Sequence, residues 1–485
     1  MTRADPGSSD APVAAPAPAL PRSFLVALVV GCLGGNLVAA LGTPLIPTVA
    51  RLYGVSLDAA QWTLTISLLV GVVVTPLVSR LADGGKRRRL LMITLAFICL
   101  GGVLAAVATS FPVLLVARAL EGLGYAIIPL GIGIARQYLT GPRLTTALIA
   151  LSLSLAVGSG IANPIIGGLV ETAGYQYAFW FAAAVSGGSI LWIRVAVPAD
   201  QPGARRPGFD FPGAVLLSVT LAALMLGITK GESWGWTSPR VATLLIGGVL
   251  VAAVWVRLEL RTAIPLIDLR LALHRAVLAA NLSAVLFGMA MFMLTSLISR
   301  LVQTPTSIPY GLGGTALTSG TLLLVQALGS LAAQPITRIA ARRLGLGAVL
   351  PLGGLLVCGG VLFMAVEHGS VLWLAAVMAF VGLGVGMTFA ATPALIVANV
   401  PEGRAASATG LNTLIRLFGG AVGSALSAVI LAINTPAGAT YPDEHGYVVG
   451  CIVSAGFALA IVVSGVLLVR PGRAGAGPDR DQELI

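Results

Sequence analysis

Long hydrophobic runs separated by short polar stretches dominate the pattern of this 485-residue chain. Because a backbone in lipid must satisfy its own hydrogen bonds, a run of about 20 apolar residues predicts a membrane-spanning helix. Fourteen such runs are present, and they cover residues 24–49, 61–81, 89–109, 112–137, 145–170, 176–197, 211–230, 240–259, 276–301, 313–336, 346–366, 371–398, 405–433 and 446–469.

The composition agrees with this pattern. Hydrophobic residues make up 57% of the chain and charged residues only 10%, whereas a soluble domain carries about 25% charged residues. The expected fold class is therefore an all-α integral membrane protein with 14 transmembrane helices, surrounded by a lipid bilayer.

The distribution of basic residues predicts how the helices are oriented. With both termini inside, 23 of the 29 basic residues fall in inner loops and tails and only 4 on the outer side, a bias that indicates cytoplasmic termini. Because the net charge of +11 is spread over these loops, no nucleic-acid partner is expected. The excess of Arg over Lys, with abundant Ala and Gly, is typical of a GC-rich bacterium, so we expect the bacterial cytoplasmic membrane.

Enzymatic and metal chemistry find no support in the sequence. The four cysteines and three histidines form no metal-binding or disulfide pattern. An intramembrane enzyme needs a cluster of His, Asp, Ser or metal ligands at the span ends, and none is present. A channel built from symmetric subunits is not favoured either, since one chain with fourteen unequal spans suits a monomer.

A weak internal repeat divides the chain into two halves. The segment Pro76–Asp83 after the second run is similar to Pro335–Arg343 after the tenth, which indicates two six-helix halves in parallel repeat. The predicted parts are a disordered cytoplasmic tail at 1–22, an N-terminal half at 23–200, two inserted helices at 201–262, a C-terminal half at 263–470 and a cytoplasmic tail at 471–485.

The fourth run contains an arginine and a glutamate one helical turn apart. Arg118 and Glu121 lie about ten residues from the nearest loop, where a charge in lipid costs roughly 2.5–3.5 kcal/mol. Their spacing places both on one helix face. They form either a permanent structural ion pair or a pair in which Glu121 takes up a proton when Arg118 turns away, and the sequence leaves both possibilities open.

Three segments resemble signatures of the major facilitator superfamily, and the inserted helices resemble its fourteen-span drug:proton antiporter family. The first segment, Ser79–Leu90, is similar to the loop signature between the second and third spans. The resemblance implies a conformational latch formed by Asp83 and Arg87. Positive-inside anchoring is the alternative role, and it explains the arginines but not Asp83.

The second segment, Arg118–Gly124, is similar to the fourth-span signature, whose arginine is tied to proton coupling in the family. Glu121 stands where the family usually has Gln. In the first span, Gly42 stands where the family usually has an acidic residue, so Glu121 is the remaining acidic candidate for proton coupling.

The third segment, Gly158–Gly168, resembles the fifth-span antiporter signature, with Asn163 where Gly usually stands. Exporters of the superfamily carry this signature and importers generally do not. The resemblance implies a kinked, tightly packed helix. The residues that form this kink are Gly160, Pro164, Gly167 and Gly168.

The family geometry also implies a central cavity lined by spans 1, 2, 4, 5, 9, 10, 12 and 13. Hydrogen bonding between helices is the alternative role for polar residues in these spans. The mid-span polar residues are Asn36, Thr65, Asn163, Asn281, Gln326, Asn412 and Arg416. Because no acid lies near Arg416 in its own span, we expect it to answer Glu121 across the cavity or to receive an anionic substrate.

Together these features predict a proton-coupled exporter (antiporter) of amphipathic small molecules, such as antimicrobials or secondary metabolites. Its expected mechanism is alternating access. The proton gradient is the expected energy source, with no bound cofactor or metal. The alternative is a proton-coupled importer or symporter of a small metabolite with the same fold.

Overall fold

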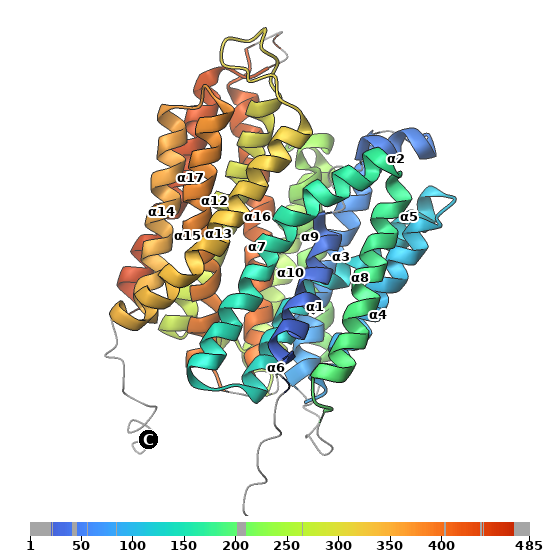
Figure 1. Ribbon diagram of the computed structural model, residues 1–485, viewed down its shortest axis with the longest axis vertical. Helices are drawn as coiled ribbons and strands as arrows, with labels where there is room; N and C mark the ends of the chain where they lie inside the picture. The colour runs from blue at the N-terminus through green and yellow to red at the C-terminus, as the bar shows by residue number, and fades with distance from the viewer. Residues whose placement is uncertain are drawn as a thin grey trace, which may run out of the picture.

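The computed structural model describes residues 21, 23–40, 46–55, 57–83, 85–200, 210–263, 265–401, 404–436, 439 and 441–469. Regular structure in these residues is helical, and the long helices stand side by side as a bundle (Figure 1). The helices are α1 (Phe24–Ala40), α2 (Ile46–Tyr53), α3 (Leu57–Asp83), α4 (Arg87–Ala106), α5 (Phe111–Glu121), the 3₁₀ helix η2 (Gly122–Ala126), α6 (Ile127–Tyr138), α7 (Gly141–Thr172), α8 (Tyr175–Ala196), α9 (Phe211–Trp234), α10 (Pro239–Arg261), α11 (Leu269–Ala272), α12 (Arg275–Gln303), α13 (Ala316–Leu344), α14 (Leu346–Val366), α15 (Val371–Asn399), α16 (Ala405–Ile433) and α17 (Glu444–Leu468).

Twelve helical segments in the described residues are long and apolar enough to cross a membrane. They correspond to twelve of the fourteen predicted runs, with α5, η2 and α6 together making one segment, Phe111–Tyr138. The predicted count of fourteen transmembrane helices is therefore not supported by the described residues. The expectation of an all-helical, multi-pass membrane protein holds.

The two remaining runs explain the difference in count. In the run 24–49 the described residues form α1, of 17 residues, and the start of α2, and residues 41–45 lie outside the described set. At 1.5 Å per residue, α1 is about 25 Å long, less than the roughly 30 Å of a hydrocarbon core. The run 145–170 lies in α7, which has 32 residues, some of them outside the described set.

Local sequence signals set where several helices begin. Pro142 and Pro239 lie in the first turn of α7 and α10, where the missing N–H of proline costs nothing. The side chains of Asp210 and Ser370 accept hydrogen bonds from backbone N–H groups three residues on, at 2.9 Å and 3.2 Å, and so cap α9 and α15.

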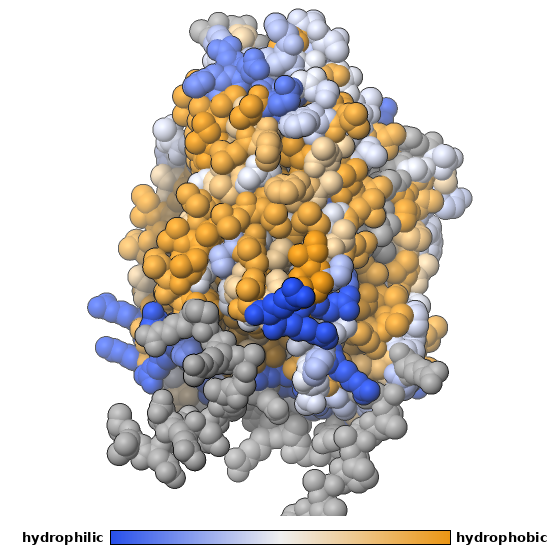
Figure 2. Space-filling view, turned by 60° about the vertical axis from the view of Figure 1, so that its left-hand side comes forward, coloured by the Kyte–Doolittle hydropathy of each residue, from blue (hydrophilic) through white to orange (hydrophobic). Residues whose placement is uncertain are grey.

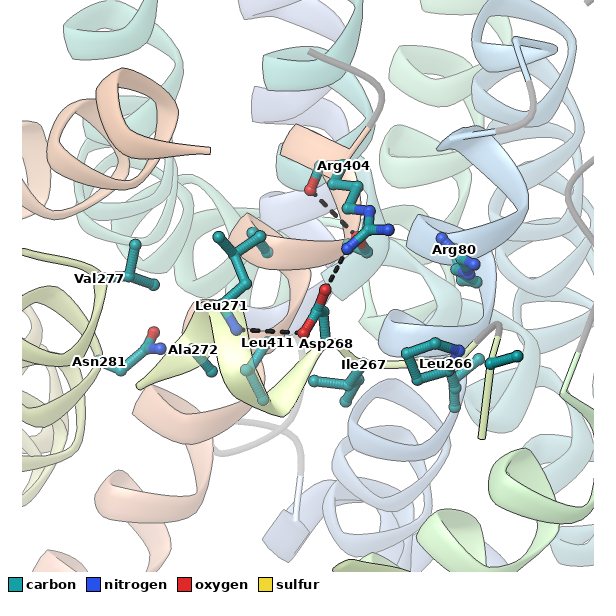
Figure 3. Close-up of a pocket in the computed structure, with 14 residues that line it drawn as sticks. Arg80, Leu266, Ile267, Asp268, Leu271, Ala272, Val277, Asn281, Arg404 and Leu411 are labelled. Atoms are coloured by element: carbon teal, nitrogen blue, oxygen red, sulfur yellow. Dashed lines mark hydrogen bonds and ion pairs between the residues drawn. The ribbon is translucent and has the colours of Figure 1, made fainter. Parts of the chain in front are cut away.

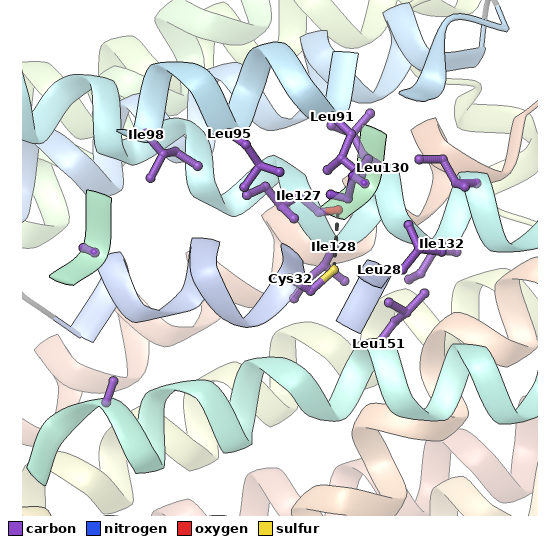
Figure 4. Close-up of a cluster of buried hydrophobic side chains, with 14 of the residues drawn as sticks. Leu28, Cys32, Leu91, Leu95, Ile98, Ile127, Ile128, Leu130, Ile132 and Leu151 are labelled. Carbon is purple, nitrogen blue, oxygen red and sulfur yellow. Dashed lines mark hydrogen bonds between the residues drawn. The ribbon is translucent and has the colours of Figure 1, made fainter. Parts of the chain in front are cut away.

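Buried apolar side chains form two main clusters. The first, which we call the N-terminal cluster, connects α1, α3, α4, α5, α6, α7 and α8 and reaches the ends of α15 and α16 that face it. Figure 4 shows Leu28 and Cys32 of α1 among isoleucines and leucines of α4, α6 and α7. The second connects α12, α13, α14, α15, α16 and α17 around residues such as Phe287 and Val381. The domain bounds drawn from the sequence stay a prediction.

The two inserted helices occupy one side of the bundle. They pack on each other, and α9 also packs against α3 and α16, one helix from each cluster. Ile246, Val249, Leu250 and Val254 of α10 are exposed, and Figure 2 shows a broad hydrophobic band between more hydrophilic ends of the molecule. Lipid would cover such a surface.

The two clusters meet along a seam, where α7 packs against α13 and α15, and α16 packs against α3 and α6. The seam is close-packed at Gly410 of α16, where a Cβ would lie 2.4 Å from the hydroxyl oxygen of Ser79 in α3. Only glycine permits this approach of the two helices.

The first and last described helices meet the same end of the bundle. Phe24, at the start of α1, packs edge-to-face on Tyr138 at the end of α6, with ring centroids 5.8 Å apart. Arg275, the first residue of α12, donates to the carbonyl oxygen of Leu467 near the end of α17 at 3.4 Å. The start of α1 and the end of α17 lie toward the lower end in Figure 1, and we call this end of the bundle the terminal end.

Candidate functional site

A small cavity lies in the seam between the two clusters. Four helices contribute to its wall: α6 and α7 from the N-terminal side, and α15 and α16 from the C-terminal side. Its volume is about 10 Å³, room for about one water molecule. The residues that line this central cavity are Ile128, Ile132, Ser152, Phe389, Pro393, Thr409, Asn412, Thr413 and Arg416.

Arg416 is the charged residue of the central cavity. Its side chain is buried at 7% exposure, and its guanidinium carbon lies 4.6 Å from the centre of the Phe389 ring. Phe389 in turn packs edge-to-face on Phe287 of α12. Among the described residues no carboxylate forms an ion pair with Arg416. The structure thus buries a positive charge against an aromatic face.

The backbone at Arg416 is fixed by the packing of α16 on α12. A Cβ at Gly288 would lie 2.2 Å from the carbonyl oxygen of Arg416, so the two helices touch backbone to backbone. Gly419 and Gly423 repeat this close contact on the same side of α16, against Val285 and Met289. The Arg416 side chain reaches the cavity from a rigid helix.

Arg118 and Glu121 form an ion pair inside the N-terminal cluster. Nη1 of Arg118 donates to Oε2 of Glu121, and both side chains are almost fully buried. Nε of Arg118 donates to the carbonyl oxygen of Thr63 at 3.2 Å, and the Ser67 hydroxyl donates to the carbonyl oxygen of Arg118 at 2.7 Å. The pair is therefore anchored to α3.

Glu121 also lies at a break in the helix. It is the last residue of α5, and the five residues Gly122–Ala126 that follow are a 3₁₀ helix. Its Cγ lies against α4, 2.9 Å from where a Cβ on Gly101 would stand. The described lining of the central cavity includes neither Arg118 nor Glu121, so the structure does not place Glu121 opposite Arg416.

The predicted latch residues lie at the terminal end. Asp83 is 3.9 Å from Nη1 of Arg80 and lies beside Ser407 at the start of α16. Arg87 donates to Oε1 of Gln137, next to the end of α6, at 3.2 Å. Asp83 therefore lies where the end of α3 meets α16, that is, at the seam.

A larger cavity of about 90 Å³ opens beside these latch residues (Figure 3). Arg404 forms an ion pair with Asp268 at its wall, and Asp268 also accepts from the backbone N–H of Leu271 at 3.1 Å. Arg80 and Asn281 line the same cavity. This cavity lies between the start of α16 and the segment that connects the inserted helices with α12.

The remaining predicted residues fall into different places. Asn412 donates both to the Ala280 carbonyl at 3.1 Å and to Oδ1 of Asn281 at 3.2 Å. Gln326 is buried and donates to the Met291 sulfur at 3.3 Å. Thr65 is buried in α3, and neither Thr65 nor Gln326 is among the described lining of the central cavity. Of the predicted cavity set, the structure thus brings Asn412 and Arg416 together.

The fifth-span glycines differ sharply from one another. A Cβ at Gly160 would lie 2.2 Å from the Cβ of Ala327 in α13, whereas a Cβ at Gly168 would meet nothing within 4 Å. Gly160 is therefore a contact across the seam and Gly168 is not. The side chains of Asn36, Asn163 and Pro164, the packing of Gly167, and Gly42 as a whole lie outside the described residues.

The sequence prediction missed seven of the nine residues that line the central cavity, among them Thr409 and Thr413 of α16. One signal for them was present. Thr409, Asn412, Thr413 and Arg416 are spaced by three and four residues, so they form one polar face of an otherwise apolar helix.

The prediction also missed a buried pair of acids. Asp210, before α9, and Glu259, near the end of α10, are both buried, and a Cβ on Gly213 would lie 2.2 Å from Oδ2 of Asp210 and 2.8 Å from Oε2 of Glu259. Glu259 accepts from the backbone N–H of Ile267 at 2.5 Å, and Asp210 from that of Gly213 at 2.9 Å. Two ionised carboxylates this close repel each other in a buried site, so we expect the pair to share a proton.

Substitutions at Glu259 should reveal this shared proton. Glu259→Gln supplies an amide N–H in place of the acid O–H, so the thermal midpoint of unfolding of the purified protein should stay close to that of the wild type. Glu259→Ala leaves the Ile267 N–H without its partner and should cost about 1–3 kcal/mol of stability. Equal destabilisation by Gln and Ala would show that the pair holds no proton.

A multi-pass helical bundle with a polar, charged cavity in the seam between two helix clusters is an architecture that membrane transporters use. The chain belongs to the Major Facilitator Superfamily, whose sequence pattern matches residues 24–424 and again residues 280–483.

Named relatives extend the comparison. The chain is 26% identical over 472 residues to the multidrug resistance protein B homolog of Mycobacterium tuberculosis, covering 93% of this chain and 84% of that protein. It is 27% identical over 397 residues to the quinolone resistance protein NorB of Staphylococcus aureus, covering 81% and 84%. The crystal structure of the human organic anion transporter MFSD10 (TETRAN) shares the fold, with a TM-score of 0.64 at 16% identity, over 92% of this chain and 99% of that one.

Proposed function

We propose that this chain is a proton-coupled exporter of amphipathic small molecules, which works by alternating access. The observation that carries the proposal is the central cavity, because it combines a buried guanidinium, hydroxyl and amide groups and apolar side chains between the two helix clusters. Amphipathic molecules need both kinds of contact. The names of the two bacterial relatives, which concern multidrug and quinolone resistance, support a drug efflux role.

Proton coupling rests on the buried pair in the fourth run. Glu121 is shielded from water, its Oε1 has no hydrogen-bond partner among the described residues, and it ends a helix at a 3₁₀ segment. A 3₁₀ stretch inside a membrane helix marks a candidate hinge. Movement of Arg118 away from Glu121 would leave a buried carboxylate that binds a proton from the side then open to water.

The direction of transport rests on the fifth-span segment. Its resemblance to the antiporter signature favours export, and Gly160 gives it a contact with α13 across the seam. The latch is proposed to act at the terminal end, where Asp83 lies beside Ser407. An importer or symporter of a small metabolite remains the competing function.

The proposed topology has fourteen spans, with α1 and α7 added to the twelve, as in the fourteen-span drug:proton antiporter family that the inserted helices resemble. Both helices pack within the N-terminal cluster. The terminal end would then face the cytoplasm of a bacterium, because Arg87, Arg136 and Arg275 lie at helix ends there. The chain would act as a monomer with a small-molecule substrate and no bound cofactor.

Everted membrane vesicles provide the test. Respiration acidifies their interior, and a pH-sensitive dye reports the gradient. We expect norfloxacin or nalidixate, two quinolone-type drugs that carry a carboxylate, to discharge part of this gradient only in vesicles that contain the chain, since an exporter would move drug inward and protons outward. A symporter would leave the gradient unchanged when drug is added outside, and that result with both drugs would exclude the antiporter.

A further inference from the structure

Among the described residues, the central cavity contains a buried positive charge and no carboxylate. The other arginine buried deep in a described span, Arg118, has a carboxylate partner in Glu121. Arg416 is buried to a similar degree, yet its recorded partner is the face of Phe389. A buried charge without a counter-charge is costly to keep. In a membrane span such a residue is a candidate functional site, where the counter-charge can arrive with a ligand.

The neighbouring polar groups leave Arg416 as the donor that faces the cavity. The hydroxyls of Ser152, Thr409 and Thr413 donate to carbonyl oxygens of their own helices, at 2.7 Å, 2.8 Å and 3.0 Å. Asn412 uses both N–H groups of its amide, on the Ala280 carbonyl and on Asn281. An incoming group that needs hydrogen-bond donors therefore finds them on the guanidinium.

The geometry around Arg416 suits a planar anion attached to an apolar body. Phe389 covers one face of the guanidinium, and that stacking leaves the N–H edge available for two parallel hydrogen bonds. Ile128, Ile132 and Pro393 supply an apolar wall. A ligand cation would be repelled by Arg416.

We propose that Arg416 is the recognition point for the carboxylate of an amphipathic aromatic anion, which is the substrate class of this transporter. This inference rests on the proposed export function. The cavity of about 10 Å³ is too small for such a molecule, so the ligand enters when α6 and α7 separate from α15 and α16. The carboxylate then replaces water at the guanidinium edge, and the ring lies along Phe389.

The test compares two probes that differ only in charge, 2-naphthylacetate and 2-naphthylacetamide. Their binding to the purified full-length chain in detergent is measured by calorimetry. We expect the wild type to bind the carboxylate about tenfold or more tightly than the amide. Equal affinities, or no binding of the carboxylate, would overturn the inference without any variant being needed.

Three variants locate the preference. Arg416→Gln should weaken carboxylate binding by about tenfold or more and leave amide binding within about twofold, whereas Arg416→Lys should keep part of the preference. Arg275→Gln, which removes an exposed charge at the start of α12, is the matched control and should change neither. If Arg416→Gln weakens both probes equally in a folded protein, Arg416 is a packing residue and the inference is wrong.

The binding assay needs no proton gradient, so it separates the two proposals. A carboxylate preference without drug-driven proton release in vesicles would leave the site standing and remove the export function. Drug-driven proton release with equal binding of the two probes would contradict the role of Arg416 and leave the export function standing.

Discussion

A double variant in which Arg118 and Glu121 are both changed to Gln should fold as the wild type does and should lose proton-driven export. Each single change leaves one buried charge alone, and breaking a buried pair in this way costs about 3–5 kcal/mol. Removing both charges avoids that cost. The double variant therefore separates what the pair does for stability from what Glu121 does for coupling.

Two measurements are needed on the same preparations. In detergent, the wild type and the double variant should have similar midpoints of thermal unfolding. Glu121→Gln and Arg118→Gln should both unfold at lower temperatures. Drug-driven proton release in everted vesicles should be absent from the double variant. A double variant that is stable and still exports with normal pH dependence would show that the pair is purely structural.

The second large effect is expected at Gly160. Changing Gly160 to Ala places a Cβ 2.2 Å from the Cβ of Ala327, so α7 and α13 have to move apart. Overpacking of this kind costs about 1–3 kcal/mol, which lowers the population of the arrangement closed at the seam by about 5- to 150-fold. Export should fall accordingly, because every transport cycle has to pass through a closed arrangement.

Gly168→Ala is the matched control, since it lies on the same helix and in the same segment. A Cβ there meets nothing within 4 Å, and replacing a helical Gly by Ala stabilises by up to about 1 kcal/mol. The two variants should thus differ in the sign of their effect on thermal stability. Similar export rates for both would mean that the α7–α13 contact plays no part in transport.

These glycines also show where sequence patterns stop being informative. The signature in the fifth span includes both Gly160 and Gly168. Which of the two contacts another helix depends on how α7 packs against α13, and the sequence does not show this. The same limit applies to Glu259, which the sequence places at the end of an apolar run. Its partner Asp210 lies at the start of another helix, so their contact is a product of the fold.

Helix positions, in contrast, follow from hydropathy alone. Twelve of the predicted runs recur as membrane-spanning segments because a helix in lipid must bury its own backbone polar groups. The prediction from hydropathy was incomplete where the local geometry of a helix matters, because hydropathy does not determine it. Length and composition cannot show that the run 112–137 changes to a 3₁₀ helix after Glu121.

The five residues of η2 connect Glu121 mechanically to the central cavity. A 3₁₀ helix rises 2.0 Å per residue with 3.0 residues per turn, and an α-helix rises 1.5 Å with 3.6 residues per turn. Conversion of these residues to α-helix would shorten the segment by about 2.5 Å and turn α6 by about 100° relative to α5. Ile128 and Ile132 on α6 would rotate with that helix. A change in the hydrogen-bond pattern of η2 would therefore move one wall of the central cavity.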